Sequence, residues 1–303
     1  MTISVLMSAY KGERFIRQQL DSIVRQTRSA DEFVIVDDCS PDDGATISIV
    51  EEYSKKYSYI KLYKNERNLG WASSFMNGLN YLTGDIVFFA DQDDVWEVDK
   101  IERMTDLFEN TRINGVISDC QNVDVNLKAI NKRESTGELR TDCFPFDKHF
   151  IYPKGVGAAM ALRKSFISQY KNLWVKGFGH DRFFQVVLIM FDKLYFLDLP
   201  LIKHRNHGDN ATAGKSFEIE KRIRTLNGNI EFIKKIKAVG LWKNLSEDQK
   251  ETIVKYYEYA TTRKTMLEKK SLLRWTAMPL YNLSFYPTNK TWFGDLKCIV
   301  RRR

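Results

Sequence analysis

Short apolar runs alternate with amphipathic segments along the first 108 residues of the chain. The apolar runs predict strands at residues 3–8, 32–37, 60–63 and 85–90. Apolar positions three and four residues apart predict helices at residues 13–25, 72–82 and 98–108, and another helix that carries Val50 and Tyr53. Because this alternation produces right-handed crossovers, we expect an α/β fold with a mostly parallel central sheet and helices on both faces.

The alternation stops near Gly115, and the remaining chain has a different pattern. One more strand is expected at residues 115–120, then a polar, irregular stretch to residue 153 and a buried helix at residues 181–191. Beyond residue 214, apolar positions recur every three or four residues among many charges, which is typical of helices. We therefore predict a core domain over residues 1–214 and a C-terminal helical extension over residues 215–303.

The net charge of +8 is distributed unevenly between these two parts of the chain. The extension holds 20 basic and 9 acidic residues, whereas residues 1–214 have a net charge of −3. Because a neutral-to-acidic core would not extend a phosphate-binding groove, no nucleic-acid partner is expected. Two interpretations of the basic extension stay open: a peripheral contact with an anionic membrane, or a helical bundle that packs on the core or forms a homo-oligomer.

The composition, with 43% hydrophobic and 28% charged residues, is that of an ordinary globular protein. The four cysteines are scattered without a C-x-x-C pair, which favours reduced thiols over a disulfide frame or a zinc site. No signal peptide is expected, and the apolar runs are far shorter than the about 18 residues of a membrane span. We expect a cytoplasmic protein that is soluble or peripheral at the inner face of the membrane.

The sequence DQDD at residues 91–94 places three carboxylates directly after an apolar strand. Such clustering is unfavourable unless a cation lies among the carboxylates, and hard divalent ions prefer oxygen ligands that they share with a substrate diphosphate. The alternative is a solvated acidic loop that caps the next helix. The motif therefore predicts a metal site only together with other residues.

Two further polar segments follow strands of the predicted sheet, where ligands of parallel sheets bind. Asp37 and Asp38 could accept hydrogen bonds from a nucleobase or a ribose, or one of them could cap the turn at Ser40. Asn68 and Gly70 lead into a helix whose amides suit an anion, although an ordinary loop with a helix cap has the same pattern.

Four ordered motifs resemble those of family 2 glycosyltransferases of the GT-A fold: SVLMSAYKGE at residues 4–13, VDDCS at 36–40, NLG at 68–70 and DQDDVW at 91–96. The resemblance covers residues 1–210. It implies a nucleotide-diphospho-sugar donor, Mn²⁺ or Mg²⁺, and inversion at the anomeric carbon. By position it implies that Asp93 is a metal ligand, that Asp37 lies near the ring N–H of the base, and that the donor is held by Ala9, Tyr10, Glu13, Asp38, Asn68, Gly70, Asp91 and Gln92.

Two later motifs extend the resemblance. GHDRFF at residues 179–184 carries Asp181 where the family has its general base, with His180 in place of the preceding acid, as in rhamnosyltransferase-like members. KHRNHGDN at residues 203–210 implies that His207 completes the metal site and that Arg205 neutralises the leaving diphosphate. Residues 209–214 would form a loop that closes on the donor.

We therefore predict a nucleotide-sugar-binding catalytic domain that transfers a sugar from dTDP-rhamnose or a UDP-hexose to a glycan hydroxyl. The acceptor, whether a lipid-linked oligosaccharide, a polysaccharide or a glycoprotein glycan, belongs to bacterial cell-surface synthesis in such relatives. A non-catalytic sugar-nucleotide-binding or scaffold protein and a sugar nucleotidyltransferase stay open as alternatives. The latter would have a Gly-rich basic loop after the first strand, where this chain has AYKG at residues 9–12.

Overall fold

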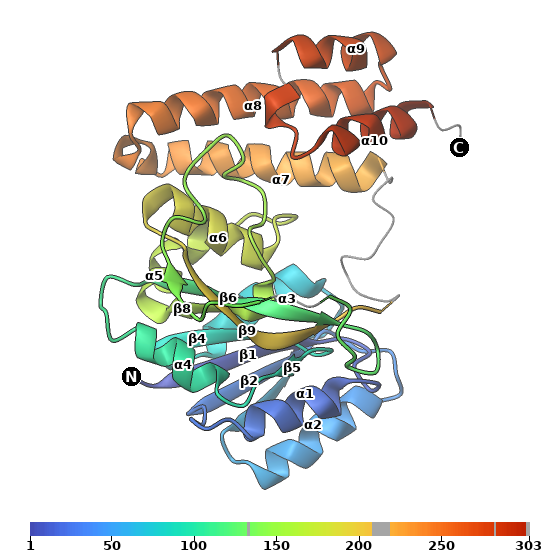
Figure 1. Ribbon diagram of the computed structural model, residues 1–303. Helices are drawn as coiled ribbons and strands as arrows, with labels where there is room; N and C mark the ends of the chain where they lie inside the picture. The colour runs from blue at the N-terminus through green and yellow to red at the C-terminus, as the bar shows by residue number, and fades with distance from the viewer. Residues whose placement is uncertain (132–133, 208–218, 282, 301–303) are drawn as a thin grey trace. The chain divides into compact units, whose positions relative to one another are not determined.

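The computed structural model describes residues 1–131, 134–207, 219–281 and 283–300 (Figure 1). Contacts between residues divide the chain into two compact units. The first comprises residues 1–144, 154–172 and 192–208, and the second comprises residues 145–153, 173–191 and 209–303. The expected domain boundary near residue 214 lies outside the described residues and stays a prediction.

One half of the sheet in the first unit is parallel, as predicted. Its strands lie in the order β3 (Ile60–Lys64), β2 (Glu32–Asp37), β1 (Ile3–Ala9) and β4 (Ile86–Asp91). Each parallel ladder joins five or six residue pairs. β1, β2 and β4 are buried almost throughout because both faces of this half are covered.

Helices cover both faces, which confirms that part of the prediction. α1 (Ile16–Val24) and α2 (Ala45–Lys56) lie on one face and α3 (Trp71–Gly78) on the other (Figure 1). α3 continues into the short helix η1 (Leu79–Tyr81), and α4 (Lys100–Leu107) follows the acidic loop. The carboxyl ends of β1, β2 and β4 carry the predicted site residues to one edge of the sheet.

The other half of the sheet is mixed. It continues through β8 (Met160–Arg163), β6 (Gly115–Val123), β9 (Tyr195–Arg205) and β5 (Val95–Trp96), while β7 (Leu139–Arg140) also pairs with β9. β6 and β9 are parallel, whereas the antiparallel ladders join only two or three residue pairs each. The sheet is therefore mostly parallel, with nine strands among the described residues. η2 (Gly157–Ala159), α5 (Lys164–Tyr170) and η3 (Lys171–Leu173) complete this unit.

β9 was not predicted, although it is the longest strand among the described residues. Its sequence YFLDLPLIKHR pairs buried and half-exposed positions two by two instead of alternating them. The register with β6 shifts on either side of Asp119, where Pro200 is its partner. These irregularities remove the period of two that marks a strand in sequence.

The second unit is helical, and its C-terminal part confirms the predicted extension. It contains α6 (His180–Phe191), α7 (Ile219–Ala238), α8 (Glu247–Glu268), α9 (Leu272–Tyr281) and α10 (Asn289–Val300), with the short helices η4 (Leu241–Asn244) and η5 (Leu283–Phe285). Phe178, just before α6, and Phe183 of α6 pack on Phe232 of α7, with the three ring centroids 5.1–6.4 Å apart. None of the described helices is long and apolar enough to cross a membrane.

Candidate active site

The loop after β1 is held against the acidic loop by Gln92. The side-chain amide of Gln92 donates to the carbonyl of Tyr10, and its oxygen accepts from the amide of Tyr10, both at 2.8 Å. A Cβ on Gly12 would lie 2.5 Å from the Gln92 oxygen, so a side chain there would displace it. Ala9 is buried at the end of β1, whereas Tyr10 and Glu13 are exposed. Gln92 thus positions the loop that presents Tyr10.

Asp37 closes the turn that follows β2. Its carboxylate accepts from the Ser40 hydroxyl at 2.6 Å and from the Ser40 amide at 3.0 Å, and the residue is 2% exposed. The turn cap that the sequence left open as an alternative is therefore formed. Each carboxylate oxygen of Asp37 accepts one hydrogen bond from Ser40, and the expected contact of Asp37 with a base N–H stays a prediction.

Asp38 holds the loop before α3 in place. Its carboxylate accepts from the Asn65 amide at 2.8 Å and from the backbone amides of Leu69 and Gly70, both at 2.9 Å. Asn68 donates to the Asp38 carbonyl at 3.2 Å. Two of the amides expected to suit an anion therefore donate to Asp38, and the role of Asn68 and Gly70 in donor binding stays a prediction.

Asp94 holds the acidic loop against the end of β9. It is fully buried, and its Oδ1 accepts from the Arg205 amide at 3.0 Å and lies 3.1 Å from Nδ1 of His204. Burial alone would lower the pKa of His204, but the hydrogen bond to Asp94 and the negative charges of Asp94, Asp91 and Asp93 raise it to about 9. The imidazolium therefore donates to Asp94 and offsets its charge.

Arg205 is 1% exposed, and all its nitrogens face protein acceptors. Nε donates to the Asp93 carbonyl at 2.7 Å, Nη1 to the Val125 carbonyl at 2.5 Å and Nη2 to the Gln18 oxygen at 2.6 Å. The guanidinium also lies 4.5 Å from the centre of the Phe15 ring. Through Nε, Arg205 orients the backbone of Asp93, and its expected contact with the leaving diphosphate stays a prediction.

Asp93 and His207 come together although 114 positions separate them in the chain. Oδ2 of Asp93 lies 2.8 Å from Nε2 of His207, with 17% and 8% of the two side chains exposed. Burial and the negative charge of Asp94 raise the pKa of Asp93, although the bond to His207 acts in the opposite direction. A site that destabilises its own carboxylate in this way is suited to a cation.

The donor set fits a divalent cation that also takes ligands from a substrate. Two ligand atoms about 3 Å apart can share one ion at metal–ligand distances of about 2.0–2.2 Å. Oδ2 of Asp94, on the next residue, is buried without a hydrogen-bond partner. Among the described residues no group of three or more His, Cys, Asp or Glu side chains could hold a metal by itself. Mg²⁺ and Mn²⁺ sites with one or two protein ligands are completed by phosphate oxygens and water.

In the second unit, Asp181 lies in the first turn of α6 and is partly exposed. A carboxylate in this position is stabilised by the helix dipole. The preceding His180 is 3% exposed, and burial lowers its pKa to about 4, so the imidazole is neutral near pH 7. The predicted closing loop at residues 209–214 lies outside the described residues.

Comparison with known proteins decides the family. The model of the family described as glycosyl transferase family 2 matches residues 4–169, which include β1 to β8 and the acidic loop. This chain belongs to glycosyl transferase family 2. The family 2 chain is 28% identical over 283 residues to an uncharacterized glycosyltransferase of Nostoc sp., covering 85% of this chain and 83% of the relative. It is 25% identical to the dTDP-rhamnosyl transferase RfbG of Shigella flexneri, covering 78% and 79%.

Solved structures share the fold of this family 2 chain. The S. aureus TarS structure in complex with UDP-GlcNAc superposes with a TM-score of 0.65 at 16% identity, covering 86% of this chain and 72% of the other. The TarS structure in complex with UDP superposes with a TM-score of 0.58 at 15% identity, covering 99% and 88%. The GT-A expectation for the fold is therefore confirmed.

One buried residue near the acidic loop of the family 2 chain, Lys100, was not predicted from sequence. Lys100 is fully buried, donates to the Ala158 carbonyl at 2.5 Å and lies 3.9 Å from the centre of the Trp96 ring. Burial lowers its pKa to about 7, against the opposing charges of Asp94 and Asp91. A lysine in an amphipathic helix is expected at the surface, so no local signal marks this position.

Proposed function

We propose that this family 2 glycosyltransferase is inverting and metal-dependent and transfers a sugar from a nucleotide-diphospho-sugar to a hydroxyl of a glycan acceptor. The observation that carries the proposal is the pair of Asp93 and His207, 2.8 Å apart at the edge of the sheet where β4 ends. Asp93 alone belongs to a common acidic loop. Its pairing with a histidine from the end of β9 is the arrangement a metal–diphosphate site requires.

Each of the remaining groups has a proposed task. The exposed ring of Tyr10 and the carboxylate of Glu13 flank the base and ribose of the donor, on a loop fixed by Gln92. Asp93 and His207 would hold Mn²⁺ or Mg²⁺, which supplies positive charge to the departing diphosphate. Asp91, the last residue of β4, would contact the ribose and the sugar–phosphate side.

Asp181 is the proposed general base. It would take the proton of the acceptor hydroxyl while that oxygen bonds to the anomeric carbon and the bond from carbon to the diphosphate oxygen breaks. A single displacement of this kind inverts the anomeric configuration. The preceding His180 is neutral near pH 7, because burial lowers its pKa to about 4.

The donor is proposed from the relatives. RfbG of Shigella flexneri is a dTDP-rhamnosyl transferase, which favours dTDP-rhamnose, and the TarS complexes with UDP-GlcNAc and UDP favour a UDP-hexose. The acceptor is proposed to be a lipid-linked, polysaccharide or glycoprotein glycan of the bacterial cell surface, which would place the enzyme in the cytoplasm. A non-catalytic binding protein would hold a donor and never consume it.

The test is a donor-hydrolysis screen over dTDP- and UDP-sugars, each with Mn²⁺ and with a chelator. We expect one donor class to be consumed, and only with the metal. Asp93→Ala should abolish this turnover, whereas Asp106→Ala, an exposed aspartate on α4, should not change it. Equal, metal-independent rates for all donors would contradict the proposal.

A further inference from the structure

α9 exposes an apolar face that nothing in the described chain covers. Leu272, Leu273 and Leu280 are 50%, 81% and 74% exposed. At 100° per residue these three positions fall within one side of the helix, together with the exposed Thr276 and Ala277. In the helical unit, α9 lies on the outer side of α8 (Figure 1). Single exposed leucines are common on protein surfaces, but a helix face made of them marks an interaction site.

Aromatic rings extend this face onto α10. Trp275 and Trp292 stack with centroids 4.4 Å apart and an angle of 8° between their planes. Phe293 lies 6.3 Å from Trp275 and is 52% exposed. Trp275 stands three residues after Leu272 and therefore on the adjoining side of α9. We call Leu272, Leu273, Trp275, Leu280 and Phe293 the α9–α10 face.

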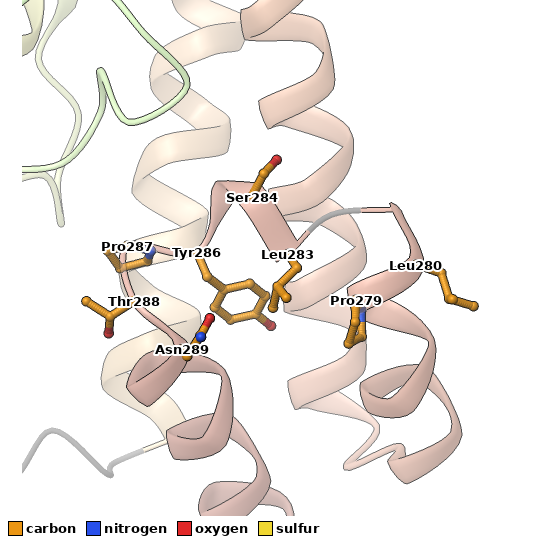
Figure 2. A pocket seen from close by; sticks show the side chains of 8 residues that line it. All are labelled: Pro279, Leu280, Leu283, Ser284, Tyr286, Pro287, Thr288 and Asn289. Carbon is orange, nitrogen blue, oxygen red and sulfur yellow. The ribbon is translucent and has the colours of Figure 1, made fainter.

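A shallow groove of about 650 Å³ borders this face (Figure 2). Its lining joins Leu280, Leu283 and Pro287 with neutral polar side chains and contains no charged residue. Leu283 and Tyr286 point toward each other across the groove, whereas Leu280 projects outward from α9 (Figure 2). The groove is thus open, uncharged and only partly apolar, unlike an enclosed pocket for a small ligand.

Within residues 269–303 the exposed charge has one sign, and the acidic Glu268 directly before this segment is paired with Lys264 at 3.5 Å. Residues 269–303 contain eight basic residues and one acidic residue. That acid, Asp295, is fully buried and binds Arg222 at 2.6 Å and Arg263 at 2.7 Å. Within the described part of this segment, the exposed charged side chains are therefore all basic, namely Lys269, Lys270, Arg274, Lys290 and Lys297.

We propose that the α9–α10 face docks on the surface of an anionic lipid bilayer. Leucine, tryptophan and phenylalanine side chains would enter the interface, and the lysines around them would contact anionic headgroups. The binding is peripheral, consistent with the lack of any described helix able to cross a membrane. A second copy of the chain fits less well, because a symmetric contact would bring the same basic residues against each other.

The test is flotation of the full-length protein with two kinds of vesicle, phosphatidylcholine alone and phosphatidylcholine with roughly 30 mol% phosphatidylglycerol. We expect the protein to float with the anionic vesicles only, and raised salt to release it. Leu273→Ser/Leu280→Ser and Lys269→Gln/Lys270→Gln should each weaken this partitioning at least about tenfold. Because the changed side chains are exposed, the fold should be retained.

Matched controls change the same kinds of residue elsewhere. Val98→Ser/Val239→Ser replaces side chains that are 54% and 53% exposed, and Lys55→Gln/Lys56→Gln replaces an exposed lysine pair on α2. Both should float as the unchanged protein does. Equal flotation with both vesicle types, or leucine variants that bind normally, would overturn the proposal. So would a dimer in solution that the leucine variant converts to a monomer. Donor turnover without vesicles should be equal in all variants, which separates this test from the proposed activity.

Discussion

Replacing Arg205 with lysine tests whether this residue positions the metal site or contacts the substrate. Lysine keeps the positive charge but has a single ammonium group. It cannot reach the Asp93 carbonyl, the Val125 carbonyl and the Gln18 oxygen at the same time, which the guanidinium does at 2.7, 2.5 and 2.6 Å. The variant therefore separates charge from geometry.

The expected loss of stability follows from these contacts. About two part-buried acceptors lose their donors, at about 1–2 kcal/mol each because water reaches them in part. The stacking of the guanidinium on Phe15, at 4.5 Å, contributes about 1 kcal/mol more. The two contributions together predict a loss of about 3–5 kcal/mol in the free energy of unfolding. Arg17→Lys, in the exposed pair with Glu52, should cost less than about 1 kcal/mol.

The assays are urea unfolding and a titration of Mn²⁺ in the presence of UDP. Because Arg205 holds the backbone of Asp93, Mn²⁺ affinity should fall about 10- to 100-fold in Arg205→Lys. If that variant is too unstable, Gln18→Ala removes only one acceptor and should give a smaller change in the same direction. Unchanged stability and Mn²⁺ affinity with a raised KM for the donor would refute the positioning role and make Arg205 a ligand of the diphosphate.

Three further predictions concern individual side chains. His207→Ala should lower metal-dependent turnover at least about tenfold, while Asn206→Ala on the neighbouring exposed residue should not; equal rates would remove His207 from the metal site. Asp181→Ala should abolish turnover but retain donor binding by calorimetry, with Asp248→Ala as the exposed control; normal turnover would exclude Asp181 as the base. Raising the pH from about 7.5 to about 9 should increase the free energy of unfolding by about 2 kcal/mol through Lys100. Over this range folded Lys100 has lost its proton, because its pKa is about 7, whereas the lysine of the unfolded chain still holds it. Urea unfolding at both pH values should show this increase in the unchanged protein and not in Lys100→Met.

Local patterns predicted the parallel half of the fold closely. β1, β2 and β3 begin at the predicted residues, and β4 begins one residue later than predicted. β1, β2 and β4 are buried on both faces, so each is largely an apolar run bounded by turn residues, whereas β3 at the end of the sheet is only partly buried. β9 was not predicted, because a shift in its register with β6 interrupts the alternation of buried and exposed positions.

The sequence indicated which residues lie near the site more reliably than it indicated what each of them contacts. Asp93 and His207 were expected at one metal, and they lie 2.8 Å apart. Asp38 and Arg205 were expected to contact the donor, which stays a prediction, and the structure shows both buried in hydrogen bonds to neighbouring loops. A buried carboxylate that holds a loop and an exposed one that binds a ligand have the same sequence signature.

By itself, the sequence determined the alternation of strands and helices, the edge of the sheet that carries the polar loops, and the division of charge between an acidic core and a basic extension. These depend on periodicity and composition, which are local. Tertiary structure alone decided that β9 brings His207 to Asp93, that Arg205 is enclosed, and that α9 leaves its leucines exposed. Those outcomes depend on contacts between residues more than a hundred positions apart, or on which face of a helix its neighbours cover, and no local pattern records either.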